Sequence, residues 1–293
     1  QIAEVINMLY KNKINLTQNK IYLDYDIDKR VMTYPYIAFV KIAEGCNNNC
    51  SYCAIPKIKG RYHSRSITNI KEEVEMLVNQ GVKEINLIAQ DTTNYGVDIY
   101  NKPSLSELLE KLVEIPGDYI LRILYAYPTN IDESLLDIIK SSPKIAKYLD
   151  IPLQHINDRI LRLMKRPMNS ESIKDTVDMI KNKLPEITLR TTFIVGFPTE
   201  TEKEFEELLS FIKKYKFDRV GAFKYSREEG TYASTLEPQI TSKVKMYRYD
   251  KLMTLQRSIS KRKNSNLVGN VFKVLAERYD PDRRLFIGRS ERE

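Results

Sequence analysis

The sequence EGCNNNCSYCAIPKIKGRYHSR, residues 44–65, contains every cysteine of the 293-residue chain: Cys46, Cys50 and Cys53. Three cysteines placed at random would share an eight-residue window in roughly a fifth of a per cent of cases, so the cluster requires a chemical reason. Thiolates are soft ligands that suit zinc and iron–sulfur clusters. A metal centre is therefore the first hypothesis for this stretch.

The spacing Cys-x-x-x-Cys-x-x-Cys leaves three interpretations open. Such a loop can bind three corners of a cubane iron–sulfur cluster, and the missing fourth cysteine would leave one iron open to a substrate. Alternatively, His63 could complete a four-ligand zinc site, although structural zinc sites usually have paired Cys-x-x-Cys knuckles. The third interpretation is three unligated thiols. The ligand-spacing rules favour the cluster.

Segments rich in β-branched and aromatic residues alternate with segments of helical periodicity around and beyond this loop. Strands are expected to begin near residues 36, 84, 119, 148, 187 and 219. Helices are expected at residues 67–80, 105–115, 132–141, 158–165, 170–184, 200–215 and 242–264. Six β–α units predict an α/β fold in which a parallel sheet curls into a partial (β/α)6 TIM-like barrel. The cysteine loop and the other polar motifs follow the strands, where barrel enzymes place their chemistry.

The remaining segments indicate the domain organisation. Residues 1–35 are expected to form an N-terminal helix and a polar linker, in a chain that begins inside a longer polypeptide. Residues 36–264 form the predicted barrel core. Residues 265–293 contain two short apolar runs that predict the start of a small C-terminal β-domain. An isolated hairpin is marginally stable, so we expect an incomplete or frayed end.

Composition excludes several classes of protein. The chain is 42% hydrophobic and 29% charged, which is typical of a soluble protein. No apolar run approaches the roughly 18 residues that a membrane span needs, and the N-terminus has no signal-peptide pattern. Clustered cysteines in an otherwise cysteine-free chain favour the cytoplasm over a disulfide framework. The net charge of +8 favours an anionic partner such as RNA or a ribosome, without indicating sequence-specific nucleic-acid contact.

The cysteine loop resembles the motif of radical S-adenosylmethionine (radical SAM) enzymes, Cys-x-x-x-Cys-x-aromatic-Cys, with Tyr52 as the aromatic residue. From about Tyr36 onward the chain resembles the methylthiotransferases of that superfamily. The strings that carry this resemblance are GCNNNCSYCAIPKIKGRYHSRS (45–66), LIAQDTTNYGVD (87–98), LDIPLQH (149–155), LRTTFIVGFPTETE (189–202) and FKYSREEGT (223–231). Within the family, AQDTTNYGVD resembles the branch that modifies an aspartate of a ribosomal protein.

The resemblance implies an activity and its cofactors. Cys46, Cys50 and Cys53 would bind three irons of a 4Fe-4S cluster, and SAM would bind the fourth iron and be cleaved there. The expected product is a methylthio group on the β-carbon of an aspartate in protein twelve of the small ribosomal subunit. Flavodoxin or ferredoxin is the kind of electron donor expected. The C-terminal runs resemble the start of the TRAM domain, a small β-barrel found in this family.

The resemblance also implies a second 4Fe-4S cluster in an N-terminal domain, whose cysteines this chain lacks. We therefore expect the chain to cleave SAM without completing methylthiolation. The alternative within the family is a tRNA methylthiotransferase that acts on an adenosine. The alternative from a different class is a zinc-stabilised RNA-binding module without redox chemistry.

Five residues are candidates for SAM binding on this resemblance. Tyr52 would lie near the adenine, or would serve only as a packing aromatic. Gln90 and Gln154 end two predicted strands and offer both a hydrogen-bond donor and an acceptor. Arg190 lies within an apolar strand and needs an anionic partner, either the SAM carboxylate or a nearby Asp or Glu. Gly196 would let the backbone approach the adenine.

Three further positions have two alternative interpretations or depart from the family pattern. Asp91 could bind a ribose hydroxyl, but a turn or cap role is favoured for it. His155 could contact SAM or be a core or surface histidine. Thr199 stands where the family usually has the second glycine of GFPGE, and a position that needs a positive φ would resist threonine.

A basic loop follows the cysteines and contains Lys57, Lys59, Arg61, His63 and Arg65. A run of this kind is usually a solvated surface loop. Contact with an acidic substrate, or charge balance for the cluster, is the functional alternative.

Overall fold

The structure is a computed structural model that describes residues 34–292. The N-terminal helix and most of the linker expected before residue 35 lie outside the described residues, so those two predictions stay untested. No helix of the described part is long and apolar enough to cross a membrane.

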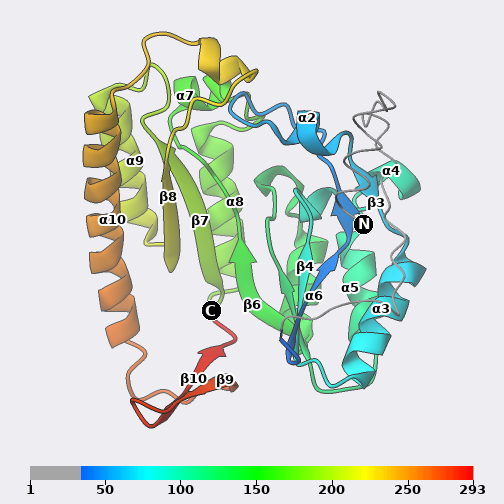
Figure 1. Cartoon of the computed structure of the whole chain (residues 1–293). Coiled ribbons are helices and arrows are strands. Elements are labelled where there is room, and N and C mark those ends of the chain that lie inside the picture. Colours follow the sequence, from blue (N-terminus) through cyan, green and yellow to red (C-terminus); the bar gives the residue numbers. More distant parts are fainter. Residues whose placement is uncertain (1–33, 293) are drawn as a thin grey trace, which may run out of the picture.

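Six parallel strands form the central sheet, and their spatial order follows the chain (Figure 1). The strands are β1 (Ile37–Lys41), β4 (Glu84–Ile88), β5 (Ile120–Ile123), β6 (Ile145–Asp150), β7 (Thr188–Val195) and β8 (Arg219–Lys224). Each pairs with the next in parallel register. The sheet curves without closing, because β1 and β8 remain its two edges (Figure 1). The predicted partial (β/α)6 barrel is confirmed.

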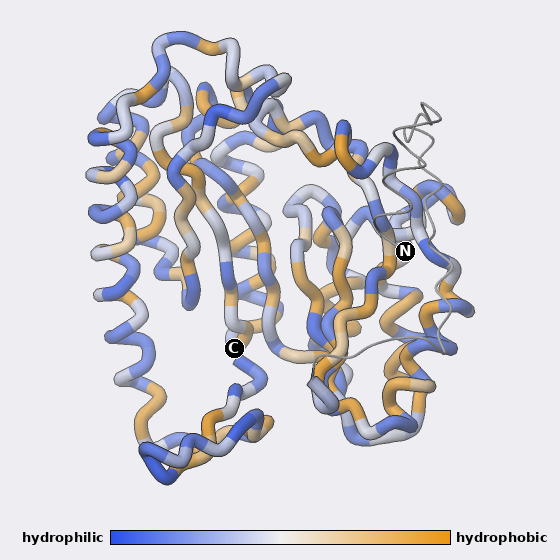
Figure 2. Tube along the Cα trace, viewed as in Figure 1, coloured by the Kyte–Doolittle hydropathy of each residue, from blue (hydrophilic) through white to orange (hydrophobic). Residues whose placement is uncertain are grey.

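Helices connect the strands and cover the outer face of the sheet (Figure 1). The longer ones are α3 (Ile67–Asn79), α5 (Leu105–Val113), α6 (Glu133–Ser141), α7 (Asp158–Leu163), α8 (Ser170–Lys183), α9 (Glu202–Tyr215) and α10 (Ser242–Ser265). All of them lie within a few residues of the predicted ranges. In α5, Leu105, Leu108, Leu109 and Leu112 recur at helical spacing and are buried, which is the pattern that predicts an amphipathic helix. Figure 2 shows the hydrophobic positions along the strands and along α3, α5 and α6, whereas α10 is largely hydrophilic.

Several short elements were not predicted from the sequence. They are β2 (Ala43–Glu44), α2 (Ile55–Lys59), β3 (His63–Ser64), η2 (Thr92–Asn94), α4 (Val97–Tyr100), η3 (Pro128–Asn130) and η4 (Tyr232–Thr235). β2 and β3 pair in antiparallel fashion and bring the two ends of the cysteine loop together. They therefore fix the loop above the sheet.

The strands have different residues on their two faces. In β7, Leu189 and Phe193 belong to the main hydrophobic core, while Arg190 between them is on the opposite, inner face. In β5, Arg122 is likewise inner and lies between the core residues Leu121 and Ile123. A half-buried strand alternates in this way. The inner face of the sheet is therefore polar, and the outer face and the helices form the core.

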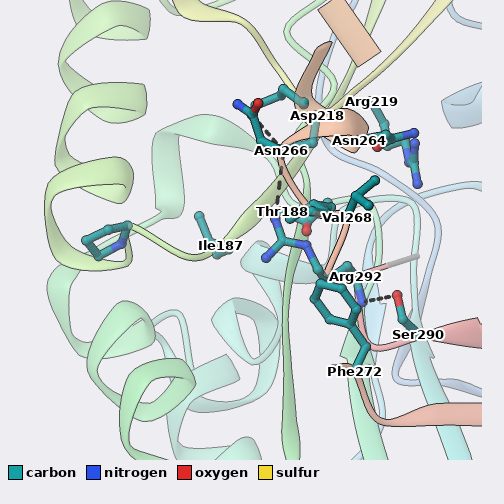
Figure 3. A pocket seen from close by; sticks show the side chains of 13 residues that line it. Ile187, Thr188, Asp218, Arg219, Asn264, Asn266, Val268, Phe272, Ser290 and Arg292 are labelled. Carbon is teal, nitrogen blue, oxygen red and sulfur yellow. Dashed lines mark hydrogen bonds and ion pairs between the residues drawn. The ribbon is translucent and has the colours of Figure 1, made fainter. Parts of the chain in front are cut away.

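The C-terminal segment forms an antiparallel hairpin of β9 (Val274–Asp280) and β10 (Leu285–Ser290). The two strands are as expected. The hairpin is docked on the core, because Arg289 forms an ion pair of 3.1 Å with Glu84 at the start of β4. A cavity of about 490 Å³ lies between the hairpin, the end of α10 and the starts of β7 and β8. Figure 3 shows Arg292 pointing into it toward Thr188 and Asp218.

Candidate functional site

The cysteine loop is held in place by backbone hydrogen bonds from several parts of the fold. The Cys46 amide donates to the Gly60 carbonyl (3.2 Å). The Ser51 amide donates to the carbonyl of Met164, the residue that follows α7 (3.0 Å). Gly45 has a φ of +80°, and a Cβ there would lie 2.0 Å from the Arg61 carbonyl oxygen. Only glycine fits at this position, so the turn into the loop depends on it.

The three cysteines line one cavity of about 440 Å³ at the carboxyl ends of β4, β5 and β6. This volume is in the usual range for a small-molecule site. The cavity is lined by Cys46, Asn48, Cys50, Tyr52, Cys53, Ile55, Ala89, Gln90, Tyr125, Ala126, Tyr127, Pro152, Gln154 and Arg166. The structure thus brings together the three predicted metal ligands and three of the five predicted SAM-binding residues: Tyr52, Gln90 and Gln154.

The arrangement of the thiols fits a cluster better than a single ion. All three cysteines are free and partly exposed. Within residues 34–292, no three His, Cys, Asp or Glu side chains converge as the ligands of one metal ion would. A cubane cluster does not need such convergence, because each thiolate binds a different iron. His63, the fourth ligand of the zinc alternative, is exposed and does not line the cavity.

Burial affects the protonation of the thiols. It raises the pKa of Cys46 and of Cys53, so both are protonated at neutral pH when no metal is bound. Metal binding must therefore displace protons from them.

Arg166 is a buried cation of the cavity that was not predicted from the sequence. Its Nη2 donates to the Pro152 carbonyl (2.7 Å), its Nη1 lies 3.9 Å from the Cys50 sulfur, and its guanidinium stacks 4.0 Å above the Tyr127 ring. Burial opposes its charge, but attraction to Tyr52, Tyr127 and Cys50 raises its pKa. Among the described residues no carboxylate lies within ion-pair distance of it, although Arg166 attracts the buried Asp91 carboxylate from farther away. A buried charge without a directly paired carboxylate is costly, so the site is suited to an anion.

Gln154 also has an unsatisfied group in the cavity. Its backbone has a φ of +72°, which is uncommon for a residue with a side chain. Its amide donates to the Thr192 carbonyl (2.8 Å) and its carbonyl accepts from Ile194 (2.9 Å), so hydrogen bonds to the end of β7 hold this conformation. Its Oε1 is buried and has no hydrogen-bond partner in the structure. Strain and an unpaired acceptor at one residue are typical of a ligand site.

Asp91 and His155 have structural roles. The Asp91 carboxylate caps η2 by accepting from the Asn94 amide (3.1 Å), and it also accepts from Asn48 (2.9 Å). The favoured cap role of Asp91 is thus observed. His155 is fully buried, and its Nε2 lies 3.2 Å from Glu200 Oε1. Glu200 also accepts from Arg248 of α10 (2.7 Å), so His155 belongs to a core network.

The structure does not bring Arg190 and Gly196 to the cavity. Arg190 has a protein carboxylate as its partner, because its Nε lies 3.8 Å from Asp150 Oδ1. Gly196 has a φ of +69°, and a Cβ there would meet the Lys245 side chain at 2.4 Å. It permits close packing of the turn after β7 against α10.

Thr199 has a φ of +69°, the conformation that threonine disfavours. The side chain of Arg159 donates to its Oγ1 (3.0 Å) and to its carbonyl oxygen (2.8 Å). Arg159 is itself held by Glu204 at 2.6 Å. These contacts hold the turn in its strained conformation. Threonine can therefore occupy a position where the family usually has glycine.

The basic loop is not one functional surface. Arg65 is buried and pairs with Glu73 (2.6 Å), so it belongs to the fold. Lys59 pairs with Glu44 (2.9 Å), and Lys57 donates to the Gly230 carbonyl. Only Arg61 and His63 are exposed without such a role in the structure, which favours the interpretation as a surface loop.

Sequence reasoning missed four polar or aromatic residues of the cavity: Asn48, Tyr125, Tyr127 and Arg166. Asn48 lies within the cysteine loop, and both tyrosines follow β5, a strand end that carried no recognised motif. The strand-end rule alone would have nominated Tyr125 and Tyr127. Arg166 lies between α7 and α8, and only the tertiary structure places it beside Cys50.

An open parallel barrel with three cysteines and unpaired polar groups at its carboxyl end defines the class of protein. Residues 40–212, more than half of the chain, match the family model described as "Radical SAM superfamily". The chain therefore belongs to the radical SAM superfamily.

Solved structures of this superfamily share the fold. Coproporphyrinogen III oxidase (HemN) from Escherichia coli, a radical SAM enzyme, has a TM-score of 0.58 at 16% identity, covering 77% of this chain and 54% of that one. The radical SAM methyltransferase TsrM from Kitasatospora setae, solved with cobalamin and a [4Fe-4S] cluster, has a TM-score of 0.54 at 18% identity, covering 64% and 36% of the two chains. At these identities the likeness shows the fold alone.

Curated relatives define the family within the superfamily. The chain is 47% identical over 99% of its length to "Ribosomal protein uS12 methylthiotransferase RimO" of Caldicellulosiruptor saccharolyticus, and 50% identical over 90% to the protein of that name from Dictyoglomus thermophilum. It spans 67% and 60% of the lengths of these two relatives. The family is that of the uS12 methylthiotransferases.

Proposed function

We propose that the protein is a radical SAM methylthiotransferase that attaches a methylthio group to the β-carbon of an aspartate in ribosomal protein uS12. The observation that carries the proposal is the cavity at the carboxyl end of the barrel. Its walls combine the chain's three cysteines with a buried cation and an unpaired amide oxygen. The names of the curated relatives support the reaction and the substrate.

The residues present fit a 4Fe-4S cluster with SAM on its open corner. Cys46, Cys50 and Cys53 would hold three irons, and the described residues offer no fourth thiolate. Arg166 and Gln154 would receive the polar groups of SAM. Within the described part of the chain, Arg166 has no carboxylate at ion-pair distance and Gln154 Oε1 has no hydrogen-bond donor. When bound, the cluster and SAM together supply one-electron cleavage of the sulfonium bond.

The chain itself supplies orientation, charge and exclusion of water. Tyr52 and Tyr127 cover the Cys50 side of the cavity, and burial raises the pKa of both phenols, so they stay protonated. Arg166 lies 3.9 Å from the Cys50 sulfur and would offset the negative charge of the Cys50 thiolate when the cluster is bound. Apolar walls around fixed dipoles protect reactive intermediates from solvent.

The partners follow from the same proposal. The substrate would be uS12, free or within the ribosome, and the net charge of +8 favours approach to the anionic ribosome. Flavodoxin or ferredoxin would be the one-electron donor. A second 4Fe-4S cluster would belong to the sulfur-insertion step. The cytoplasm is the compartment in which this substrate and reduced thiols meet.

The test is mass spectrometry of uS12 from a strain that lacks its own uS12 methylthiotransferase. Expression of the chain joined to the N-terminal part of the Caldicellulosiruptor saccharolyticus relative, which would supply the second cluster, should add the mass of one methylthio group to the uS12 peptide that contains the target aspartate. The chain alone should leave uS12 unmodified. The Cys50→Ala variant, expressed at the same level, should leave uS12 unmodified. A methylthio group on tRNA adenosine with uS12 unchanged would contradict the proposal and support the alternative within the family.

A further inference from the structure

Arg190 is an exposed cation in the interior of the barrel. It lies on β7, which has β6 and β8 as neighbours on its two sides. Its side chain is nevertheless 50% exposed, while Leu189 and Thr191 beside it are buried on the outer face. A strand with neighbours on both sides can expose an inner-face side chain to this extent only where the barrel interior is open to solvent. The interior therefore has room for part of a ligand next to Arg190.

Asp150 and Tyr148 are the protein partners of Arg190, and they leave part of its hydrogen-bonding capacity unused. In the parallel register, Arg190 is opposite Asp150 of β6 on the inner face. Their closest approach is 3.8 Å between Nε and Oδ1, which is longer than a hydrogen bond. Asp150 Oδ1 is buried and has no hydrogen-bond partner among the residues that the structure describes. A guanidinium presents five N–H donors in a planar fork, so this loose pair can accept a second carboxylate.

Arg190 stays charged, has a second cation beside it and is connected with the cysteine cavity. Burial opposes its charge, but attraction to Tyr148, Asp150 and Tyr125 raises its pKa, so it is always cationic. Its register partner on β8 is Arg219, a second cation. Tyr125, which is 48% exposed, also lines the cysteine cavity.

The distance between Arg190 and the cavity suits one amino-acid side chain. Thr192 is the next inner-face residue of β7, and its carbonyl accepts from the amide of Gln154, which lines the cavity. Strands rise about 3.3 Å per residue, so Arg190 lies roughly 7 Å along β7 from Thr192, toward the amino end of the strand. Its own side chain can span much of this interval. A group bound by the guanidinium would then lie just beneath the cavity.

We propose that Arg190 binds the carboxylate of the substrate aspartate inside the barrel, with Asp150 positioning the guanidinium. This inference rests on the proposed function and adds a specificity-determining residue to it. The reacting β-carbon is bonded directly to the carboxyl carbon. A bidentate contact from Arg190 therefore fixes the β-carbon within one bond of the anchor and directs it toward the cavity. Arg166 remains available to SAM, because it alone of the two arginines lines the cysteine cavity.

The test compares two synthetic peptides of the uS12 segment, one with the target aspartate and one with asparagine in its place. Binding to the anaerobically reconstituted protein with SAM is measured by fluorescence anisotropy. The unsubstituted protein should bind the aspartate peptide roughly 10–100-fold more tightly, because hydrogen bonds between charged partners are about twice as strong as neutral ones. Arg190→Gln should reduce this preference to less than about threefold. Arg190→Lys should recover only part of it, since lysine lacks the fork.

The control is Arg257→Gln, which makes the same charge change on the exposed side of α10 and should keep the full preference. Iron content and thermal unfolding are measured on every variant, and Arg190→Lys provides the comparison if Arg190→Gln folds poorly. Equal binding of both peptides by the unsubstituted protein, or a full preference in a folded Arg190 variant, would overturn this inference alone. Binding of neither peptide would overturn the inference together with the assigned substrate.

Discussion

The two ends of the barrel differ in whether their buried charged groups are paired. At the amino end of the strands, Glu84 is buried and accepts from Arg122 of β5 and from Arg289 of the hairpin, at 3.4 and 3.1 Å. At the carboxyl end, Arg166 is as deeply buried but has no carboxylate within ion-pair distance among the described residues. Gln154 beside it has an unpaired acceptor.

Paired buried charges, such as Glu84, stabilise the fold, whereas unpaired buried groups, such as those of Arg166 and Gln154, are available to bind a ligand. Breaking a satisfied buried pair leaves an uncompensated charge and destabilises the protein. An unsatisfied group raises the energy of the empty site, and a ligand that pairs with it recovers that energy as binding. Substitutions at the amino end should therefore change stability, and substitutions at the carboxyl end should change binding.

The largest effect is expected from removing a cysteine at the carboxyl end. Cys50→Ala should lose most of its iron and reduce SAM cleavage at least about 100-fold, because two thiolates cannot hold the cluster. Urea unfolding of the metal-free protein should change little, since the thiol is partly exposed. Iron analysis and assay of 5′-deoxyadenosine provide the measurement, with Ser51→Ala as the neighbouring control. Full iron content in Cys50→Ala would contradict the assignment of Cys50 as a cluster ligand.

The amino end should respond in the opposite way. Glu84→Gln should destabilise the protein by about 3 kcal/mol, because two arginines lose their shared carboxylate. Iron content and SAM affinity should stay the same. Urea unfolding is the measurement, and Glu75→Gln, which disrupts only a surface pair with Lys71, should have little effect. A loss of SAM affinity without a loss of stability would contradict the assignment of roles.

Arg166→Gln should lower ligand affinity more than stability, because it removes a buried charge that no carboxylate of residues 34–292 pairs with directly. SAM affinity should fall roughly 10-fold or more, while the stability of the metal-free protein should change by about 1 kcal/mol or less. Isothermal titration with SAM and urea unfolding test the two parts. Arg162→Gln is the matched control, since Arg162 is exposed on the nearby α7. Unchanged SAM affinity would remove Arg166 from the site.

The smallest effect concerns the strained turn after β7. Thr199→Gly should stabilise the protein by about 0.5–1 kcal/mol, because glycine adopts a φ of +69° without steric cost. The lost hydrogen bond from Arg159 offsets part of the gain. Thermal unfolding measures the change. A destabilisation of more than about 1 kcal/mol would show that the Arg159 contact outweighs the backbone strain.

The sequence predicted the barrel well because its signals are local and repeated. The run ITLRTTFIVGF predicted β7, and the apolar spacing in residues 105–115 predicted α5, since each pattern depends on residues that are neighbours in the chain. The cysteine site followed from spacing and from the strand-end rule. Elements of two to five residues, such as β2 and α2, were missed because they are stabilised mainly by the loop around them.

Partner choice could not be predicted, because it depends on tertiary distance. The sequence required a counter-ion for Arg190 but could not choose between SAM and Asp150, since only strand register brings Asp150 alongside. Glu200, 45 residues after His155, makes that histidine part of the core. Arg166 carried no local signal, and only folding places it against Cys50.

Mössbauer spectroscopy of the protein reconstituted with iron and sulfide in the absence of oxygen shows whether the three cysteines hold a cluster with one open iron. We expect about four irons per chain, with one iron site that changes its spectrum when SAM is added. A single bound zinc, or a four-iron cluster whose spectrum does not change when SAM is added, would contradict this expectation.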